Sequence, residues 1–135
     1  RGHMNASVDD RDYQQALLDR GVLLGFDFFG MDHSEFAYGK ITPDPPGHYL
    51  PTDYEACKAI VRFVRMGYVN QILVSHDIGE RIRLQVYAGW GFGHVTGHIV
   101  PLLLALGLEP TEVHTILVDN PRRLLTIPRP AGTTV

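Results

Sequence analysis

The sequence is poor in cysteine, in net charge and in long apolar runs, and each shortage excludes a class of protein. Cys57 is the single cysteine among 135 residues, so no internal disulfide can form, and we expect a reducing, cytoplasmic environment. The net charge of −3 is spread along the chain and leaves no basic stripe, so we expect no nucleic-acid and no membrane partner. No apolar run is long enough to cross a bilayer, and no secretory signal is evident. With 44% hydrophobic residues, the composition is that of a globular chain.

The most informative segment that is present runs from Gln71 to Asp77, an apolar stretch that stops at a carboxylate. It predicts a buried parallel strand whose C-terminal tip faces a site. Side chains alternate along a strand, so Asp77 shares a face with Leu73 and Ser75, while His76 faces the other way. Catalytic groups of barrel enzymes lie at this end of the strands, which makes Asp77 the leading catalytic candidate. The alternative is a carboxylate that caps the strand end.

A similar apolar run that ends in aspartate, Val22 to Asp27, predicts an earlier strand. Between the two strands, Thr52 to Gly67 carries apolar residues at helical spacing. These residues are Tyr54, Cys57, Ile60, Val61 and Val64. Strand, loop, helix and strand in this order predict a right-handed parallel crossover. A further amphipathic helix is predicted from Asp10 to Arg20, ended by Gly21, with Tyr13, Ala16 and Leu17 facing inward.

The C-terminal part of the chain is predicted to be helical from His94 onward. Its apolar stripe consists of Val95, Ile99, Leu102, Leu103 and Leu106. Pro101 is expected to kink this helix or to begin a new one. After a helix that begins near Pro110, Asn120 is expected to cap a last helical turn that has Pro121 at its first position. Residues 1–127 would then form a portion of one domain, and residues 128–135 a frayed tail.

Two long segments follow the strand tips. Phe28 to Pro51 contains too many prolines and glycines for a regular element, and connections of this length often act as lids. The segment from Ile78 to Phe92 carries Tyr87 and Trp90 among glycines, beside the Asp77 carboxylate. We therefore predict that Tyr87 and Trp90 form a wall of a substrate pocket. The alternative is that these aromatic rings pack the loop onto its own helix.

Several of these segments match one known family in order and spacing. They are Gly2-His3-Met4-Asn5, the helix from Asp12 to Gly21, Leu24 to Asp27, Gly67-Tyr68, Gln71 to Asp77 and Val118 to Arg123. Together they resemble the C-terminal part of the phosphotriesterase-like family of metal-dependent amidohydrolases, which includes lactonases and organophosphate hydrolases. The resemblance implies an α/β fold, namely the part of a (β/α)8 TIM barrel from the end of strand six through helix eight.

The resemblance also implies a metal site with two divalent ions, zinc being the first candidate. His3 would be the histidine ligand of strand six, and Asp77 would be both a metal ligand and the proton acceptor. From its own position at a strand tip beside the long Phe28 to Pro51 loop, Asp27 is predicted to shape the substrate pocket without binding metal. A bound zinc-like ion lowers the pKa of water enough for hydroxide to form near neutral pH. An alternative for His3 is that Gly2-His3-Met4 is the remnant of a cleaved purification tag.

The sequence also departs from the family pattern. A complete barrel needs about 250 residues, and the family's His-x-His pair, bridging lysine and strand-five histidine would all lie upstream of these segments. Ala6 stands where some members carry an aspartate, which puts the support of His3 in doubt. Phe28 replaces a polar residue that lactonase-like members use to contact substrate. We therefore expect an incomplete barrel that is inactive alone.

Three functional hypotheses follow. The first is a metal-dependent hydrolase of carboxylic or phosphoric esters, with lactones among the candidates, whose missing strands are supplied elsewhere. The second is a non-catalytic barrel fragment, and the third is a ligand-binding relative that keeps the pocket without turnover. The expected partners are a small ester or lactone substrate and either a second copy of the chain or the missing barrel strands.

Overall fold

The structure, a computed structural model, describes residues 1–31 and 51–127. Its strands are β1 (Leu24–Phe26) and β2 (Ile72–Val74). Its α-helices are α1 (Arg11–Asp19), α2 (Asp53–Arg65), α3 (Val100–Ala105), α4 (Pro110–His114) and α5 (Asn120–Leu125). The expected frayed tail and residues 32–50 of the expected long loop lie outside the described residues.

The predicted parallel crossover is confirmed. β1 pairs with β2 in parallel, with Leu24 opposite Ile72 and Phe26 opposite Val74. On the other edge of β1, the Arg1 amino nitrogen donates to the Leu23 carbonyl at 2.7 Å, and the Gly25 amide donates to the Arg1 carbonyl at 2.8 Å. In a parallel ladder, one residue bonds to the two residues that flank its partner, as Arg1 does here with Leu23 and Gly25 on either side of Leu24. Residues at the start of the chain thus continue the sheet beside β1.

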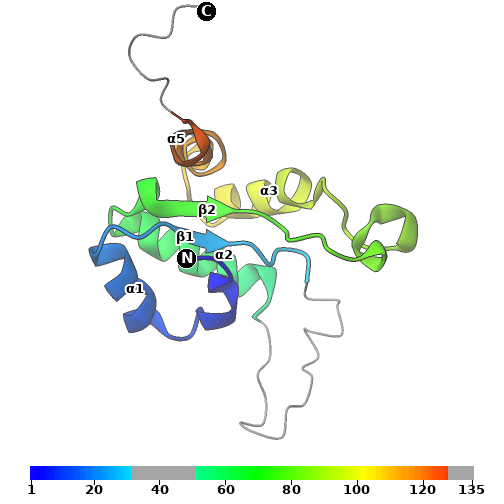
Figure 1. The fold of residues 1–135 in the computed structure, drawn as a ribbon, viewed down its shortest axis with the longest axis horizontal. Helices are drawn as coiled ribbons and strands as arrows, with labels where there is room; N and C mark the ends of the chain where they lie inside the picture. Colours follow the sequence, from blue (N-terminus) through cyan, green and yellow to red (C-terminus); the bar gives the residue numbers. More distant parts are fainter. Residues whose placement is uncertain (32–50, 128–135) are drawn as a thin grey trace, which may run out of the picture.

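The two faces of this small sheet differ. Leu24, Phe26 and Ile72 are completely buried and belong to one hydrophobic cluster with residues of α2 such as Ile60 and Phe63. Figure 1 shows α2 running behind the strands and α5 beyond β2, on the side away from β1. The opposite face of the strands carries Gly25, Asp27, Leu73 and Ser75, which line a cavity. Helices therefore cover one face of the sheet, as they do in barrels.

The helix α1 forms where predicted, but its buried face is not the predicted one. Its N-cap is Asp10, whose side chain accepts from the Tyr13 amide, and Gly21, with φ of +77°, follows its end. Gln14 and Leu18 are buried, whereas Tyr13 is 41% exposed. The prediction that Tyr13 and Ala16 face inward is therefore wrong, while the third residue, Leu17, is partly buried. The reason is that the side-chain amide of Gln14 donates to the Met4 carbonyl at 2.8 Å, which turns the face of α1 that carries Gln14 and Leu18 onto residues 4–7.

The helix α2 is set by local signals that the sequence shows directly. Thr52 and Glu55 form a capping box, and Gly67, with φ of +94°, follows the last turn. Tyr54 is 50% exposed, so its predicted place in the apolar stripe is wrong. Its ring centroid lies 4.7 Å from Nζ of the exposed Lys58, on the solvent-facing side of the helix. Cys57 is completely buried, and burial, with a smaller contribution from Asp53, raises the pKa of its thiol to about 12. The thiol is therefore protonated and unreactive near neutral pH.

Two of the three prolines in the helices α3, α4 and α5 follow a turn of π-helix. Residues Val95–Ile99 and Thr115–Asp119 form these turns, before Pro101 in α3 and Pro121 in α5. A proline cannot donate to the helical ladder, and a wider turn accommodates this. The sequence predicts that Pro101 kinks the helix or begins a new one. The structure shows a change from π to α geometry without a break in the helix, because Ile99 and Val100 before Pro101 have helical backbone angles.

The predicted capping role of Asn120 is wrong. Asp119 before it already has helical backbone angles, so the chain is helical through this point. The Asn120 side chain is completely buried, and its amide donates to the carbonyls of Val69 and Ile72, at 2.8 Å each. Asn120 thus satisfies backbone acceptors at the beginning of β2, which fixes α5 against that strand.

Across the described ranges, 1–31 and 51–127, no helix has the length and apolar character required to cross a membrane.

Candidate active site

His3 and Asp27, two of the residues selected from the sequence, are in contact. The His3 backbone amide donates to Asp27 Oδ1 at 2.8 Å, and His3 Nδ1 lies 3.2 Å from the same oxygen. The imidazole stacks on Phe28 with ring centroids 4.3 Å apart, while its side chain is 60% exposed. Because Nδ1 is engaged by the carboxylate, Nε2 is the nitrogen left for a ligand. A carboxylate on the distal nitrogen is the usual support of a metal-binding histidine.

The backbone of residues 2 and 3 lies very close to the Asp27 side chain. His3 has φ of +61°, in the left-handed region, at the beginning of the 3-10 helix Met4–Ser7. A Cβ on Gly2 would lie 2.8 Å from Asp27 Oδ2, so a larger residue there would displace the carboxylate that contacts His3. Met4 and Asn5 are buried, and Asn5 Oδ1 accepts from the Phe28 amide at 3.1 Å. Residues 2–5 are thus integrated into the fold around the tip of β1, which argues against the tag alternative for His3.

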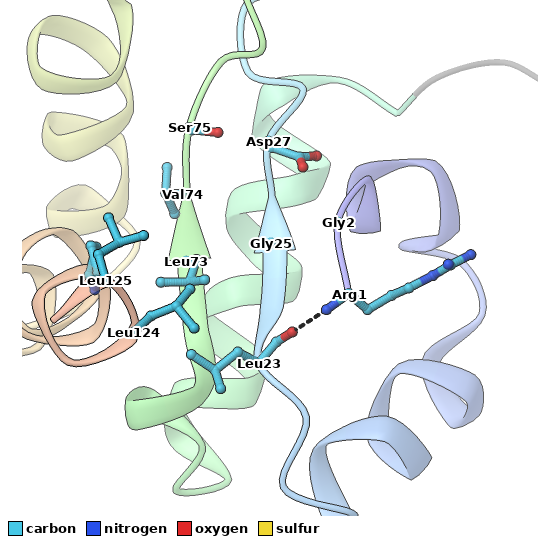
Figure 2. Close-up of a pocket in the computed structure, with 11 residues that line it drawn as sticks. Arg1, Gly2, Leu23, Gly25, Asp27, Leu73, Val74, Ser75, Leu124 and Leu125 are labelled. Carbon is cyan, nitrogen blue, oxygen red and sulfur yellow. Dashed lines mark hydrogen bonds between the residues drawn. The ribbon is translucent and has the colours of Figure 1, made fainter. Parts of the chain in front are cut away.

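A cavity of about 540 Å³ lies on the open face of the strands. Figure 2 shows its lining residues along β1 and β2, with Asp27 and Ser75 at the carboxyl ends of the two strands. The remaining lining residues are Arg1, Gly2, Leu23, Gly25, Leu73, Val74, Pro121, Leu124 and Leu125. The walls are mainly apolar, and among the lining residues Asp27 carries a carboxylate. Asp27 therefore lies where it could shape a pocket, and its contact with substrate stays a prediction.

Asp77 lies just beyond the tip of β2 and is exposed, outside the lining of this cavity. Its backbone has φ of +42°, which is rare for a residue other than glycine. The Arg83 guanidinium donates to the carbonyls of Asp77 and of His76. The His76 imidazole is engaged elsewhere, since its Nε2 lies 3.0 Å from the Phe92 carbonyl.

Among the described residues, His3 and Asp77 do not belong to a preformed metal site. No group of three or more His, Cys, Asp or Glu side chains in residues 1–31 and 51–127 is arranged to hold an ion. The donor chemistry nevertheless suits a zinc-like ion, because an imidazole with its distal nitrogen supported and an exposed carboxylate are both ordinary zinc ligands. These two residues could supply part of a ligand set.

Tyr87 and Trp90, the predicted pocket wall, do not line the cavity that contains Asp27. Tyr87 lies on the 3-10 turn Gln85–Tyr87 and is 53% exposed. Trp90 packs against both His94 and His98, with ring centroids 4.8 Å away in each case. These contacts correspond to the packing alternative, and a substrate role for either ring stays a prediction.

Sequence reasoning missed two polar contacts that organise the loops at the strand tips. His94, which is 3% exposed, has its Nε2 2.5 Å from Asp53 Oδ2, and Asp53 also accepts from the Gly30 amide at 3.0 Å. Arg83 is buried, and burial lowers the pKa of its guanidinium, although the nearby carboxylates of Asp77, Glu80 and Asp53 act in the opposite direction. Neither contact has a periodic signal, because His94 reaches Asp53 across 41 residues and Arg83 contacts the strand tip from a short 3-10 turn.

The parallel strands, the helical crossover and the polar groups at the strand tips place the chain in the α/β class whose sites lie at the carboxyl ends of a parallel sheet. The family model of the phosphotriesterase family matches residues 1–125. The chain belongs to the phosphotriesterase family, which confirms the resemblance seen in the sequence.

Individual relatives agree with this assignment. The chain is 35% identical over 124 residues to an N-acetyltaurine hydrolase of Salmo salar, covering 92% of this chain and 34% of that protein. It is 32% identical over 126 residues to an N-acetyltaurine hydrolase of Dictyostelium discoideum, covering 93% of this chain and 32% of that protein. The crystal structure of a resiniferatoxin-binding protein from Rhodobacter sphaeroides superposes with a TM-score of 0.78 at 38% identity, covering 90% of this chain and 32% of that one. The chain therefore spans about a third of the length of these relatives.

Proposed function

We propose that this chain is the C-terminal part of a TIM-barrel hydrolase that uses a divalent metal to activate water. The observation that carries the proposal is the His3–Asp27 contact at the tip of β1, which prepares an exposed imidazole with a supported distal nitrogen. The parallel order of residues 1–2, β1 and β2 is what the end of strand six followed by strands seven and eight would produce. The one-third coverage of the relatives supports the part of this proposal that treats the chain as a portion of a barrel.

In the complete protein, His3 and Asp77 would be two of the metal ligands, and upstream strands would provide the others. A bound zinc-like ion supplies acidity to water and polarises the bond to be cleaved. Asp27 holds Nδ1 of His3, which fixes the tautomer in which Nε2 carries the lone pair. Asp77 would accept the proton of the attacking water at its carboxylate. The apolar cavity beside Asp27 would receive the organic part of the substrate.

The proposed substrate class is a small acyl or phosphoryl compound, namely a carboxylic ester, a lactone or a phosphoric ester. The relatives named N-acetyltaurine hydrolase add N-acyl amides to this class, and their similarity makes an N-acyl amide the first substrate to assay. Attack of water on an acyl carbon is common to the ester, lactone and amide candidates, so one metal site could serve all three.

A ligand-binding protein without turnover is the second candidate function. It is favoured by the 38% identity to the resiniferatoxin-binding protein and by the mainly apolar walls of the cavity. A catalytically silent barrel fragment, or a homo-oligomer of this chain, would be the outcome if no upstream strands exist.

Metal removal and restoration in the full-length protein tests the proposal. Protein made metal-free with a chelator should no longer hydrolyse a panel of N-acyl amides, esters, lactones and phosphoric esters, and added zinc should restore this activity. Activity that survives complete metal removal, shown by elemental analysis, would contradict the metal-dependent mechanism. Tight binding of panel compounds to the zinc-loaded protein without any product would favour the binding function instead.

A further inference from the structure

The tip of β2 is held by an unusual arrangement of backbone and side chain. Asp77 has φ of +42°, a conformation that costs a non-glycine residue free energy unless its surroundings enforce it. The surroundings here are the Arg83 guanidinium, which donates to the carbonyls of both His76 and Asp77. These two carbonyls belong to the peptide planes on either side of the Asp77 Cα atom. Charge-assisted bonds from one planar fork therefore fix both planes, and with them the direction in which the Asp77 side chain leaves the backbone.

Arg83 is itself fixed by the loop that follows it. Its side chain is buried, although it carries a charge, and its carbonyl accepts from the Gly91 amide at 2.8 Å. A Cβ on Gly89 would lie 2.3 Å from the Arg83 carbonyl carbon, so only glycine permits this close approach. The loop from Glu80 to Gly91 therefore closes on the backbone of Arg83. Its conformation is transmitted through the guanidinium to the strand tip.

The carboxylate of Asp77 is not used in this arrangement. Arg83 bonds to backbone carbonyls, whereas the Asp77 side chain remains exposed beyond the strand. An ion pair with the carboxylate would occupy the group that the proposed mechanism needs. A contact through the backbone orients Asp77 and leaves both of its carboxylate oxygens available.

From this geometry we infer that Arg83 is a positioning residue, which sets the direction of the Asp77 carboxylate in the hydrolytic site through the two backbone carbonyls. The inference rests on the proposed function for the role of Asp77. Arg83 contacts no substrate in this role, so at saturating zinc its loss should lower kcat and leave KM nearly unchanged. Because Asp77 is also a proposed metal ligand, the loss of Arg83 should weaken zinc binding as well. Misplacement of a catalytic group by about 1 Å lowers rates by about 100-fold, which sets the scale of the expected loss.

The test compares Arg83→Met and Arg83→Lys with Arg81→Met in the zinc-loaded full-length protein. Arg81 lies on the same 3-10 turn, Arg81–Arg83, but is exposed, so it controls for loss of a positive charge. Arg83→Met should lower kcat by about 10- to 100-fold. Arg83→Lys should recover part of the loss, because it keeps the charge without the planar fork. Arg81→Met should match the unmodified protein. Equal kcat values for Arg83→Met and Arg81→Met would overturn the inference.

The backbone carbonyl carbon chemical shifts of His76 and Asp77 separate this inference from the proposed function. They are measured by NMR on metal-free protein and need no turnover. Loss of the two hydrogen bonds should move both shifts upfield in Arg83→Met and leave them unchanged in Arg81→Met, whether or not the unmodified protein is a hydrolase. If Arg83→Met does not fold, Gly89→Ala, which displaces the Arg83 backbone, takes its place with the same expected results. Unchanged carbonyl shifts at both residues in the folded variant would refute the positioning role, and an inactive unmodified protein would refute only the proposed reaction.

Discussion

The carboxylates at the tips of β1 and β2 are held in opposite ways. Asp27 is bound through its side chain, since Oδ1 accepts the His3 amide at 2.8 Å and lies 3.2 Å from His3 Nδ1. Asp77 is bound through its backbone, by way of Arg83, and its carboxylate is exposed. A carboxylate already engaged by a histidine is suited to orient that histidine. An exposed one is suited to bind a cation or to accept a proton, so two similar sequence signals support different proposed roles.

The largest effect on zinc binding and activity is expected when this chain is separated from the barrel strands that would precede it in the full-length protein. The 135-residue chain alone should bind zinc weakly and hydrolyse no member of the substrate panel, because a catalytic zinc generally takes three protein ligands and His3 and Asp77 supply two. Exposed strand edges should also make the chain oligomerise. Isothermal titration with zinc, product assays and light scattering check these outcomes, with full-length protein as the control. Stoichiometric tight binding with turnover from a monomer would show that the tips form a self-contained site.

Asp77→Asn should have the next largest effect, in the full-length protein. The amide keeps the size of the side chain but cannot accept the proton, so kcat should fall by about 10²- to 10⁴-fold. Steady-state kinetics at saturating zinc measure this loss, and circular dichroism confirms that the variant is folded. A variant that retains most of its kcat would remove Asp77 from the chemistry and leave it as a strand-end cap.

Asp27→Asn should have a smaller effect, which is the direct test of the difference between the tips. Its side chain supports His3, so activity should fall by about 10- to 100-fold while metal content stays near that of the unmodified protein. Elemental analysis and kcat measured on the same preparation separate the two quantities. Loss of metal in Asp27→Asn would instead assign Asp27 as a direct ligand, and the contrast with Asp77 would disappear.

The smallest effect is expected for the aromatic residues of the loop after β2. Trp90→Ala removes a ring that packs on His94 and His98, so the free energy of unfolding should fall by about 1–3 kcal/mol. Tyr87→Ala, at a residue that is 53% exposed, should change it by about 0.5 kcal/mol or less. Denaturant unfolding measures both. A changed order of kcat/KM among the panel substrates, with unchanged stability, would restore Trp90 as a pocket residue.

The sequence predicted the elements that depend on local signals. Apolar runs and helical spacing located both strands and the helices, and the helix predicted between Thr52 and Gly67 is α2, Asp53–Arg65. The same kind of reasoning failed for Tyr13 and Tyr54. Periodicity shows that a helix has an apolar face, but neighbouring segments decide which residues are covered, as the bond from Gln14 to Met4 does for α1.

For the candidate site, the sequence by itself supplied the candidate residues and placed Asp27 and Asp77 after the two strands, because residue type and the apolar run before it are local properties. Tertiary structure alone decided which of these groups meet. The His3–Asp27 contact spans 24 residues, and Asn120 reaches the Ile72 carbonyl across 48 residues. Arg83 returns to Asp77 from an irregular loop that has no repeating pattern. Such contacts follow from how elements pack in space, and the spacing of residues along a chain carries no record of that packing.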